Sequence, residues 1–229
     1  MTIVCIHQPD FAPWLGFFDR LAKCDTYVVL DTVQFLRRGW HHRDLIKTPQ
    51  GAQWITVPVH KKGRYHQAIR DVEIDYSSDW RDQHLKTLLA NYKRAPHFSV
   101  IFPLIEDIYK KKYPLLIDLN MSIIHLVMDL FDIQTKIVLA SDLNAAGAKT
   151  DFLVNAVSAL GGTGYLTGEG SRDYLQEDAF ESIGIQVNWQ QFEHPMYQQL
   201  FDSFISRLSV FDYLFNCGTK SDIFHNSDE

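Results

Sequence analysis

The stretch TIVCIHQPDFAPWLGFFDRLAKCDTYVVL, residues 2–30, decides the fold class. It begins with a short apolar run that ends at His7-Gln8-Pro9, because proline cannot continue a central strand. Apolar residues then recur at helical spacing over residues 14–23, and residues 27–30 form a second short apolar run. A strand, a loop, a helix and a strand within about thirty residues make a βαβ unit, which predicts two parallel strands joined by a right-handed crossover.

The chain returns to this pattern after two excursions. Residues 33–76 contain a hairpin around the Pro/Gly turn that follows Lys47, and residues 78–131 show helical periodicity in three pieces. Beyond these segments, strands and helices are again expected to alternate. The expected strands are residues 136–139, 164–166 and 186–189, and the expected helices are residues 150–160 and 176–183. We therefore expect an α/β fold, a single domain of residues 1–229 with a mainly parallel sheet, helices on both faces and a polar, frayed tail at 221–229.

Composition limits the partners of this chain. The 229 residues carry a formal net charge of −6, so we expect no binding to nucleic acid. The three cysteines are widely spaced and odd in number, which fits a reducing cytoplasm better than a disulfide framework. We find neither a signal peptide nor an apolar window of membrane-spanning length, so we expect a cytoplasmic protein without a membrane span. The sequence leaves the oligomeric state open.

Polar side chains follow the first strand, where ligands bind in an open parallel sheet. His7, Gln8 and Asp10 leave this strand, and Gly16 allows close approach near the start of the helix. We expect His7 to act as a general base, since imidazole titrates near neutral pH. The alternative is that His7 is a hydrogen-bonded structural residue and that Trp14 belongs to the core.

A second polar loop follows the strand expected at residues 164–166. It combines a hydroxyl, two glycines and an arginine, which suit a phosphate or a carboxylate. The alternative is a tight turn with a solvated arginine. We expect both loops in one crevice, with His7 and Arg172 facing the same cavity. The candidate ligand-binding residues of this loop are Tyr165, Thr167, Gly168, Gly170, Arg172 and Tyr174.

A third patch follows Asp31, at the acidic end of the second strand. Gln34, Arg38 and Arg43 lie among aromatic residues there, which suits an anionic ligand such as a nucleotide diphosphate. The alternative is a solvated hairpin face, because alternation sends half of these side chains to the opposite side. Adjacent histidines on a strand point apart, and no local spacing gathers three ligands, so we expect no structural metal.

The segments His7-Gln8-Pro9 and Pro13-Trp14-Leu15-Gly16-Phe17-Phe18 resemble the opening signature of the WbqC-like family. Later blocks of that family are resembled in the same order, among them Asp31-Thr32-Val33-Gln34-Phe35, Tyr165-Leu166-Thr167-Gly168 and His194-Pro195-Met196-Tyr197-Gln198-Gln199. The resemblance covers about residues 2–218. It implies a bacterial protein of O-antigen, lipopolysaccharide and capsule biosynthesis.

The start of the chain also resembles the HIGH-type nucleotidyltransferases, which have a Rossmann-like fold. Trp14-Leu15-Gly16-Phe17 stands where those enzymes have His-x-Gly-His, so both histidines that stabilise the transferred phosphoryl group are absent. The likeness therefore concerns the fold and does not carry over the adenylyl-transfer chemistry.

Our leading hypothesis is a transferase that adds a small group to, or otherwise modifies, a nucleotide-activated or glycan-linked sugar. The substrate is then a small anion, a nucleotide-sugar or a sugar phosphate. One rival is a nucleotidyltransferase that uses a magnesium-bound nucleotide, and the other is a non-catalytic sugar-binding or scaffolding module. The cofactor is unknown, with Mg²⁺ expected only under the first rival. Further pocket-lining candidates, from the last family block named, are His194, Tyr197 and Gln199.

Overall fold

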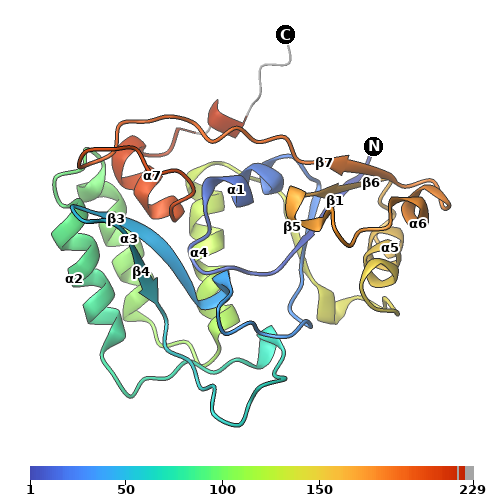
Figure 1. Cartoon of the computed structure of the whole chain (residues 1–229), viewed down its shortest axis with the longest axis horizontal. Helices are drawn as coiled ribbons and strands as arrows, with labels where there is room; N and C mark the ends of the chain where they lie inside the picture. Colours follow the sequence, from blue (N-terminus) through green and yellow to red (C-terminus); the bar gives the residue numbers. More distant parts are fainter. Residues whose placement is uncertain (221, 225–229) are drawn as a thin grey trace.

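A computed structural model describes residues 1–220 and 222–224. The chain forms a five-stranded parallel sheet with helices on both faces and a separate antiparallel hairpin (Figure 1). This arrangement confirms the predicted α/β fold with a mainly parallel sheet. The strands of the sheet, in spatial order, are β5 (Lys136–Leu139), β2 (Thr26–Val29), β1 (Ile3–His7), β6 (Gly164–Thr167) and β7 (Gln186–Trp189).

The sheet order places β1 at the point where the chain changes direction. From β1 the chain moves outward to β2 and β5, then crosses back to pair β6 with the other side of β1, in the register Val4↔Tyr165. The loops that leave β1 and β6 therefore run to opposite faces of the sheet. In open α/β sheets this divergence creates a crevice at the carboxyl ends of the two strands.

Residues 1–220 and 222–224 contain seven α-helices, some packed on the sheet and others beside the hairpin (Figure 1). Three of them, α2, α3 and α4, correspond to the three helical pieces expected within residues 78–131. The helices are α1 (Leu15–Ala22), α2 (Trp80–Tyr92), α3 (Phe98–Lys110), α4 (Leu116–Leu130), α5 (Thr150–Ala159), α6 (Glu177–Glu181) and α7 (Val210–Cys217). No helix within residues 1–220 and 222–224 is long and apolar enough to cross a membrane.

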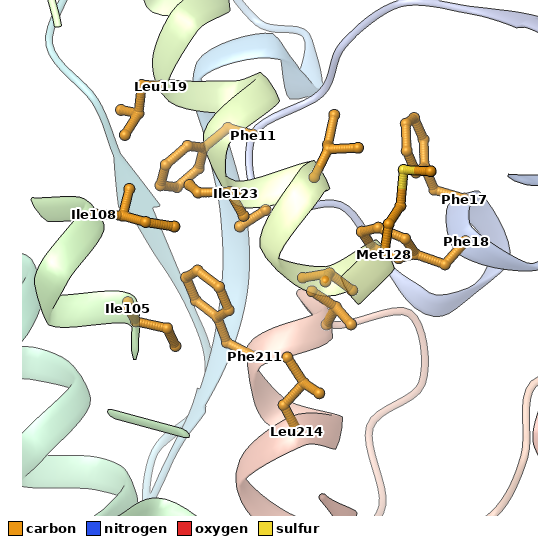
Figure 2. Close-up of a cluster of buried hydrophobic side chains, with 14 of the residues drawn as sticks. Phe11, Phe17, Phe18, Ile105, Ile108, Leu119, Ile123, Met128, Phe211 and Leu214 are labelled. Carbon is orange, nitrogen blue, oxygen red and sulfur yellow. The ribbon is translucent and has the colours of Figure 1, made fainter. Parts of the chain in front are cut away.

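Each face of the sheet has its own hydrophobic cluster. The larger cluster joins α1, α4 and α7 to the helices α2 and α3, and Figure 2 shows Phe17 and Phe18 of α1 beside Met128 of α4. The smaller cluster packs α5 and α6 on the opposite face, where the rings of Tyr165 and Phe180 stack with centroids 4.9 Å apart. The helical periodicity of residues 14–23 arises because α1 buries its apolar side chains in the larger cluster.

The predicted hairpin is formed by β3 (Arg43–Thr48) and β4 (Gly51–Thr56). Its two-residue turn places Gly51 at φ +109°, a backbone conformation that favours glycine. The second strand begins at this glycine, earlier than the expected Trp54, because Thr48 and Gly51 already pair across the turn.

Two features of the last forty residues differ from the sequence analysis. Helix α7 was not predicted, and residues 190–208 run between β7 and α7 without a helix or strand. Of the tail expected to fray, residues 221 and 225–229 lie outside the described residues. Asp222–Phe224 forms the short 3-10 helix η5, and the ring of Phe224 packs 5.0 Å from that of Phe131.

Candidate functional site

A cavity of about 710 Å³ lies at the carboxyl edge of β1 and β6. Its walls come from the ends of these strands, from the loop that precedes α5 and from the segment between β7 and α7. The structure therefore brings the first two polar loops of the sequence analysis to one cavity. A volume in this range is typical of sites for small molecules.

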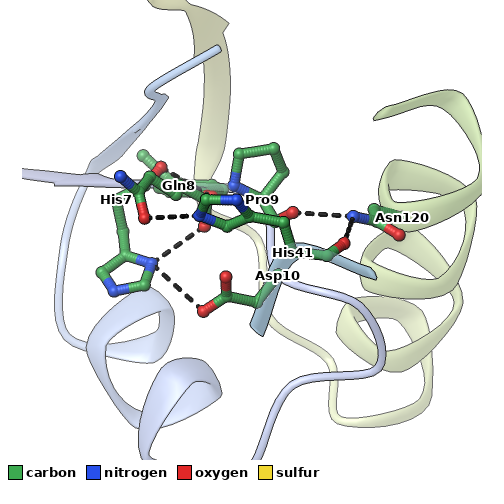
Figure 3. A network of polar contacts seen from close by, with 7 residues as sticks. His7, Gln8, Pro9, Asp10, His41 and Asn120 are labelled. Carbon is green, nitrogen blue, oxygen red and sulfur yellow. Dashed lines mark hydrogen bonds and ion pairs between the residues drawn. The ribbon is translucent and has the colours of Figure 1, made fainter. Parts of the chain in front are cut away.

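His7 is the last residue of β1, and its ring lines the cavity. Its Nδ1 lies 2.8 Å from the backbone oxygen of Gln8, as Figure 3 shows. In the neutral ring Nδ1 therefore carries the proton, and Nε2 is left as an acceptor. The hydroxyl of Tyr27 donates to the backbone oxygen of His7 at 3.1 Å, and the ring of Phe17 meets the imidazole edge-on. These contacts fix the orientation of the ring.

The loop after His7 is held by a side chain from α4. Asn120 is fully buried, and its Nδ2 donates to the backbone oxygens of Pro9 at 2.8 Å and His41 at 2.7 Å. The Nε2 of His41 also lies 2.8 Å from the Oε1 of Gln8 (Figure 3). Helix α4 and the 3-10 helix η1 (Trp40–His42) therefore fix the loop, and Asn120 is a positioning residue that the sequence analysis did not identify.

The pKa of His7 differs from the expectation of a group that titrates near neutral pH. Burial, followed by the positive charge of Arg20, lowers the pKa of His7 to about 3, so the ring is neutral at pH 7 and a weaker base than free imidazole. Burial raises the pKa of Asp10 to about 7, against the influence of Arg20. The Oδ2 of Asp10 lies 3.9 Å from Nδ1 of His7. Asp10 is therefore the group beside His7 that titrates near neutrality.

Arg20 is a functional candidate that the sequence analysis missed. Its side chain is only 8% exposed, lines the cavity and makes no hydrogen bond or ion pair with residues 1–220 or 222–224. The neighbouring Asp19 is already bound to Lys23 and Gln190, each at 2.7 Å. A methyl group at Gly168 would lie 3.1 Å from Nη1 of Arg20, so the guanidinium reaches the end of β6. The buried charge of Arg20 therefore lacks the partner that a buried charge normally has in a protein.

The second polar loop lines the cavity with a chain of hydroxyl groups. Thr167 donates to Ser171 at 3.1 Å, and the hydroxyls of Ser171 and Tyr174 lie 2.9 Å apart. Gly168 and Gly170 line the same wall, as does Tyr165. The structure places Arg172 elsewhere: its guanidinium donates to Glu169 at 2.8 Å and lies 4.3 Å from the ring of Trp189. Arg172 therefore does not line the cavity with His7.

Two further cations that the sequence analysis did not identify line the cavity, Lys149 and Arg207. Lys149 immediately precedes α5, and Arg207 lies in the segment before α7, with its guanidinium 5.6 Å from the ring of Trp14. Both residues adopt positive φ, +53° and +57°. This conformation is unfavourable for residues other than glycine, and such strain is typical of functional sites.

Trp14 lines the cavity, and Gly16 provides the space for its ring. A methyl group at Gly16 would lie 2.2 Å from the indole of Trp14, so no larger residue fits beneath it. The ring of His194 stacks on the indole with centroids 6.2 Å apart and an angle of 6° between the planes. Gly16 and His194 thus support Trp14 and do not line the cavity themselves.

The third patch lies apart from the cavity. Asp31 accepts a hydrogen bond from the backbone N–H of Ser141 at 3.0 Å, and Gln34 donates to the backbone oxygen of Tyr65 at 2.9 Å. Arg43 donates to the backbone oxygen of Arg38 at 2.7 Å and stacks 4.2 Å from the ring of Trp54. The structure therefore gives the side chains of Asp31, Gln34 and Arg43 local partners, and Arg38 is exposed. Tyr197 and Gln199 likewise have partners, since both bind the buried Asp212.

Metal ligands do not gather in the described part of the chain. Among residues 1–220 and 222–224, no group of three or more His, Cys, Asp or Glu side chains could hold a metal ion. His41 and His42 are both buried, and each contacts a different neighbour, Gln8 and Lys61.

The sequence profile of the WbqC-like protein family matches residues 8–223, which includes both loops of the cavity. The chain belongs to the WbqC-like protein family. A protein of Mycobacterium tuberculosis (strain ATCC 25618 / H37Rv), called uncharacterized protein Rv1507c, is 36% identical to this WbqC-like protein over 223 residues, which are 96% of each chain. No solved structure matches this chain significantly.

Proposed function

We propose that this WbqC-like protein is an enzyme of bacterial surface-polysaccharide biosynthesis that transfers a small group onto, or otherwise modifies, an anionic sugar derivative. The observation that carries the proposal is the unpaired guanidinium of Arg20 in the cavity. Burying a charge without a partner costs several kcal/mol, roughly, and a phosphate group of a ligand offsets that cost. The O-antigen association of the family supplies the pathway in this proposal.

The roles follow from the geometry of the cavity. Arg20 binds the anionic group of the substrate through charge-assisted hydrogen bonds. Nε2 of His7 accepts the proton of an attacking hydroxyl, and Asp10 lies next to the imidazolium that forms. The hydroxyls of Thr167, Ser171 and Tyr174 orient the substrate on the opposite wall. Three free cysteines suit activity in the cytoplasm, where thiols stay reduced.

Replacement of Arg20 tests the anion site. Nucleotide-sugars should raise the melting temperature of the native chain, because they bind the folded state. Arg20→Gln should remove that shift, while Arg64→Gln should retain it, because Arg64 is exposed and paired with Glu73 at 3.0 Å. Thermal shift measurements on the three proteins decide the matter. Equal shifts in native protein and Arg20→Gln would show that the ligand binds elsewhere.

Replacement of His7 tests catalysis separately from binding. His7→Gln should bind nucleotide-sugars with nearly native affinity and lose turnover by about 10²-fold or more, since a general base acts mainly in the transition state. Calorimetry gives the affinity, and mass spectrometry of the sugar product gives the turnover. If the native protein binds these compounds and modifies none of them, the chain is a binding module and the enzymatic proposal fails.

A further inference from the structure

The cavity crosses the edge of the sheet from one face to the other. On the α5 side its wall includes Leu30, Phe152 and Leu153, which belong to or pack on the smaller hydrophobic cluster. On the α1 side its wall includes Trp14 and Phe192, which pack on the larger cluster. We call these two ends the α5 arm and the α1 arm.

Positive charge lies at the centre and in both arms. The guanidinium of Arg20 reaches Gly168 at the end of β6, between the arms. Lys149 lies in the α5 arm, and Arg207 lies beside Trp14 in the α1 arm. Within the described residues, Glu169 is the only acidic residue that lines the cavity, and Arg172 already neutralises it. Three cations without carboxylate partners in the cavity suit a ligand that carries more than one negative charge, such as a diphosphate.

We infer that the ligand is a nucleoside diphosphate-sugar, with its diphosphate on Arg20 and its two ring systems in the two arms. This inference rests on the proposed function and names the substrate class of the same site. The nucleoside lies in the α5 arm, because the apolar walls of this arm and the ring of Phe152 can pack against a planar base. The sugar lies in the α1 arm, where Gln190 and Arg207 offer polar groups beside Trp14.

The conformation of the two outer cations agrees with this assignment. Lys149 and Arg207 are the cavity-lining residues other than glycine that adopt positive φ in the described chain. They lie in different loops, more than fifty residues apart in the sequence, and yet both direct a cation to the same cavity. One cation on each side of Arg20 adds to the attraction of the cavity for the two negative charges of a central diphosphate.

Calorimetric titration of the full chain tests the inference with a series of matched compounds. The series contains nucleoside diphosphate-sugars of several bases, the corresponding nucleoside monophosphates, sugar 1-phosphates and inorganic pyrophosphate. The complete ligand should bind about 100-fold more tightly than either monophosphate fragment, because it joins two binding groups in one molecule. Equal affinity for a sugar 1-phosphate and a nucleoside diphosphate-sugar would overturn the inference.

Variants separate the centre of the cavity from its arms. Arg20→Gln should weaken every phosphate compound, pyrophosphate included. Thr32→Trp fills the α5 arm from an exposed position, so it should weaken nucleoside monophosphates and leave sugar 1-phosphates unchanged. Arg207→Gln should weaken sugar 1-phosphates and spare nucleoside monophosphates. The surface variant Arg64→Gln is the control and should match the native protein in every titration.

The outcomes distinguish this inference from the proposed function. If pyrophosphate binds through Arg20 but no nucleoside diphosphate-sugar binds more tightly, the two-armed assignment is wrong although the anion site stands. If the complete ligand binds with the expected pattern of variants and no product forms, the assignment stands and the enzymatic proposal fails. If Thr32→Trp and Arg207→Gln affect all compounds equally, the arms do not divide the ligand as inferred.

Discussion

Arg20 and His7 line the same cavity, and a guanidinium close to an imidazole opposes its protonation. Protonation of His7 beside the charged guanidinium of Arg20 is therefore unfavourable when no anion is bound. An anion on Arg20 removes most of that opposition. His7 thus becomes a stronger base in the complex than in the free protein, and Asp10 beside it stabilises the protonated ring.

Inorganic pyrophosphate should therefore raise the pKa of His7 from its low value of about 3. NMR titration of the ring from about pH 7.5 to about pH 3 measures this, with pyrophosphate present or absent. By linkage, protonation of His7 should tighten pyrophosphate binding as the pH falls. In Arg20→Gln the anion should leave the titration of His7 unchanged. A native His7 curve that is the same with and without pyrophosphate would contradict the coupling.

His84 provides a test of stability at the same scale. It is buried, its Nε2 lies 3.1 Å from the backbone oxygen of Thr56, and burial lowers its pKa to about 4. The neutral ring therefore contributes stability that is complete above the unfolded pKa of about 6.5 and is lost as the pH falls toward 4.

His84→Phe should lower the free energy of unfolding at pH 7 by about 1–2 kcal/mol, since a buried carbonyl loses its donor. The difference in unfolding free energy between the native sequence and the variant should shrink by about 1–2 kcal/mol at pH 5. At that pH the native sequence binds a proton at His84 when it unfolds, and the variant cannot. Urea denaturation at both pH values measures it. The control is His125→Phe, which replaces an exposed histidine and removes no buried hydrogen bond.

At the scale of elements, the hairpin strand β3 holds the segment that covers the α1 arm. Lys47 of β3 is 1% exposed, and its Nζ donates to Oε1 of Gln199 at 3.0 Å and to the backbone oxygen of Ser203 at 2.7 Å. Gln199 in turn donates to Asp212 of α7 at 2.9 Å. A buried lysine therefore links the hairpin, the irregular segment and the last helix.

Lys47→Met should lower the free energy of unfolding by about 3–5 kcal/mol, because it leaves the buried oxygens of Gln199 and Ser203 without a charged donor. Hydrogen exchange in residues 199–207 should also become faster. The matched control is Lys86→Met, which removes an exposed pair with Asp82 and should leave the free energy of unfolding nearly unchanged. Denaturant titration and exchange mass spectrometry give both values. A Lys47→Met protein as stable as Lys86→Met would show that the network does not hold the segment.

Most elements could be predicted from the sequence, because a helix or strand that buries one face carries apolar residues at regular intervals. Both end strands β5 and β7 were predicted at their observed bounds, since each is a short run between polar turns. The site was less predictable. Arg20 lies on a helix, and charged residues on a helix are ordinarily predicted to face the solvent. Arg20 follows Phe17 by three residues, on the buried side of α1, and that spacing was the available signal. The position of Arg43 depends on where the hairpin packs, which local patterns do not encode.

At the scale of the whole molecule, the two hydrophobic clusters share one sheet. Cys5 of β1 belongs to the larger cluster and Val4 to the smaller one, so neither cluster forms fully without the same strand. We predict that the chain unfolds as one cooperative unit. Tryptophan fluorescence and far-ultraviolet circular dichroism should give the same transition in urea. Two separated transitions would show that the helical half unfolds independently.

The pairing of β1 with β6 has a consequence for protein synthesis. Strand β1 pairs with β2 within about twenty residues of chain, but its other edge has no partner until residue 164 has been synthesised. At translation rates of about 5–20 residues per second, the unpaired edge of β1 persists for about 7–27 seconds. An unpaired strand edge of this kind is a site of aggregation, and the incomplete chain is also unable to bind ligand. Nascent chains of this protein are thus expected to depend on chaperones until residue 164 has been made.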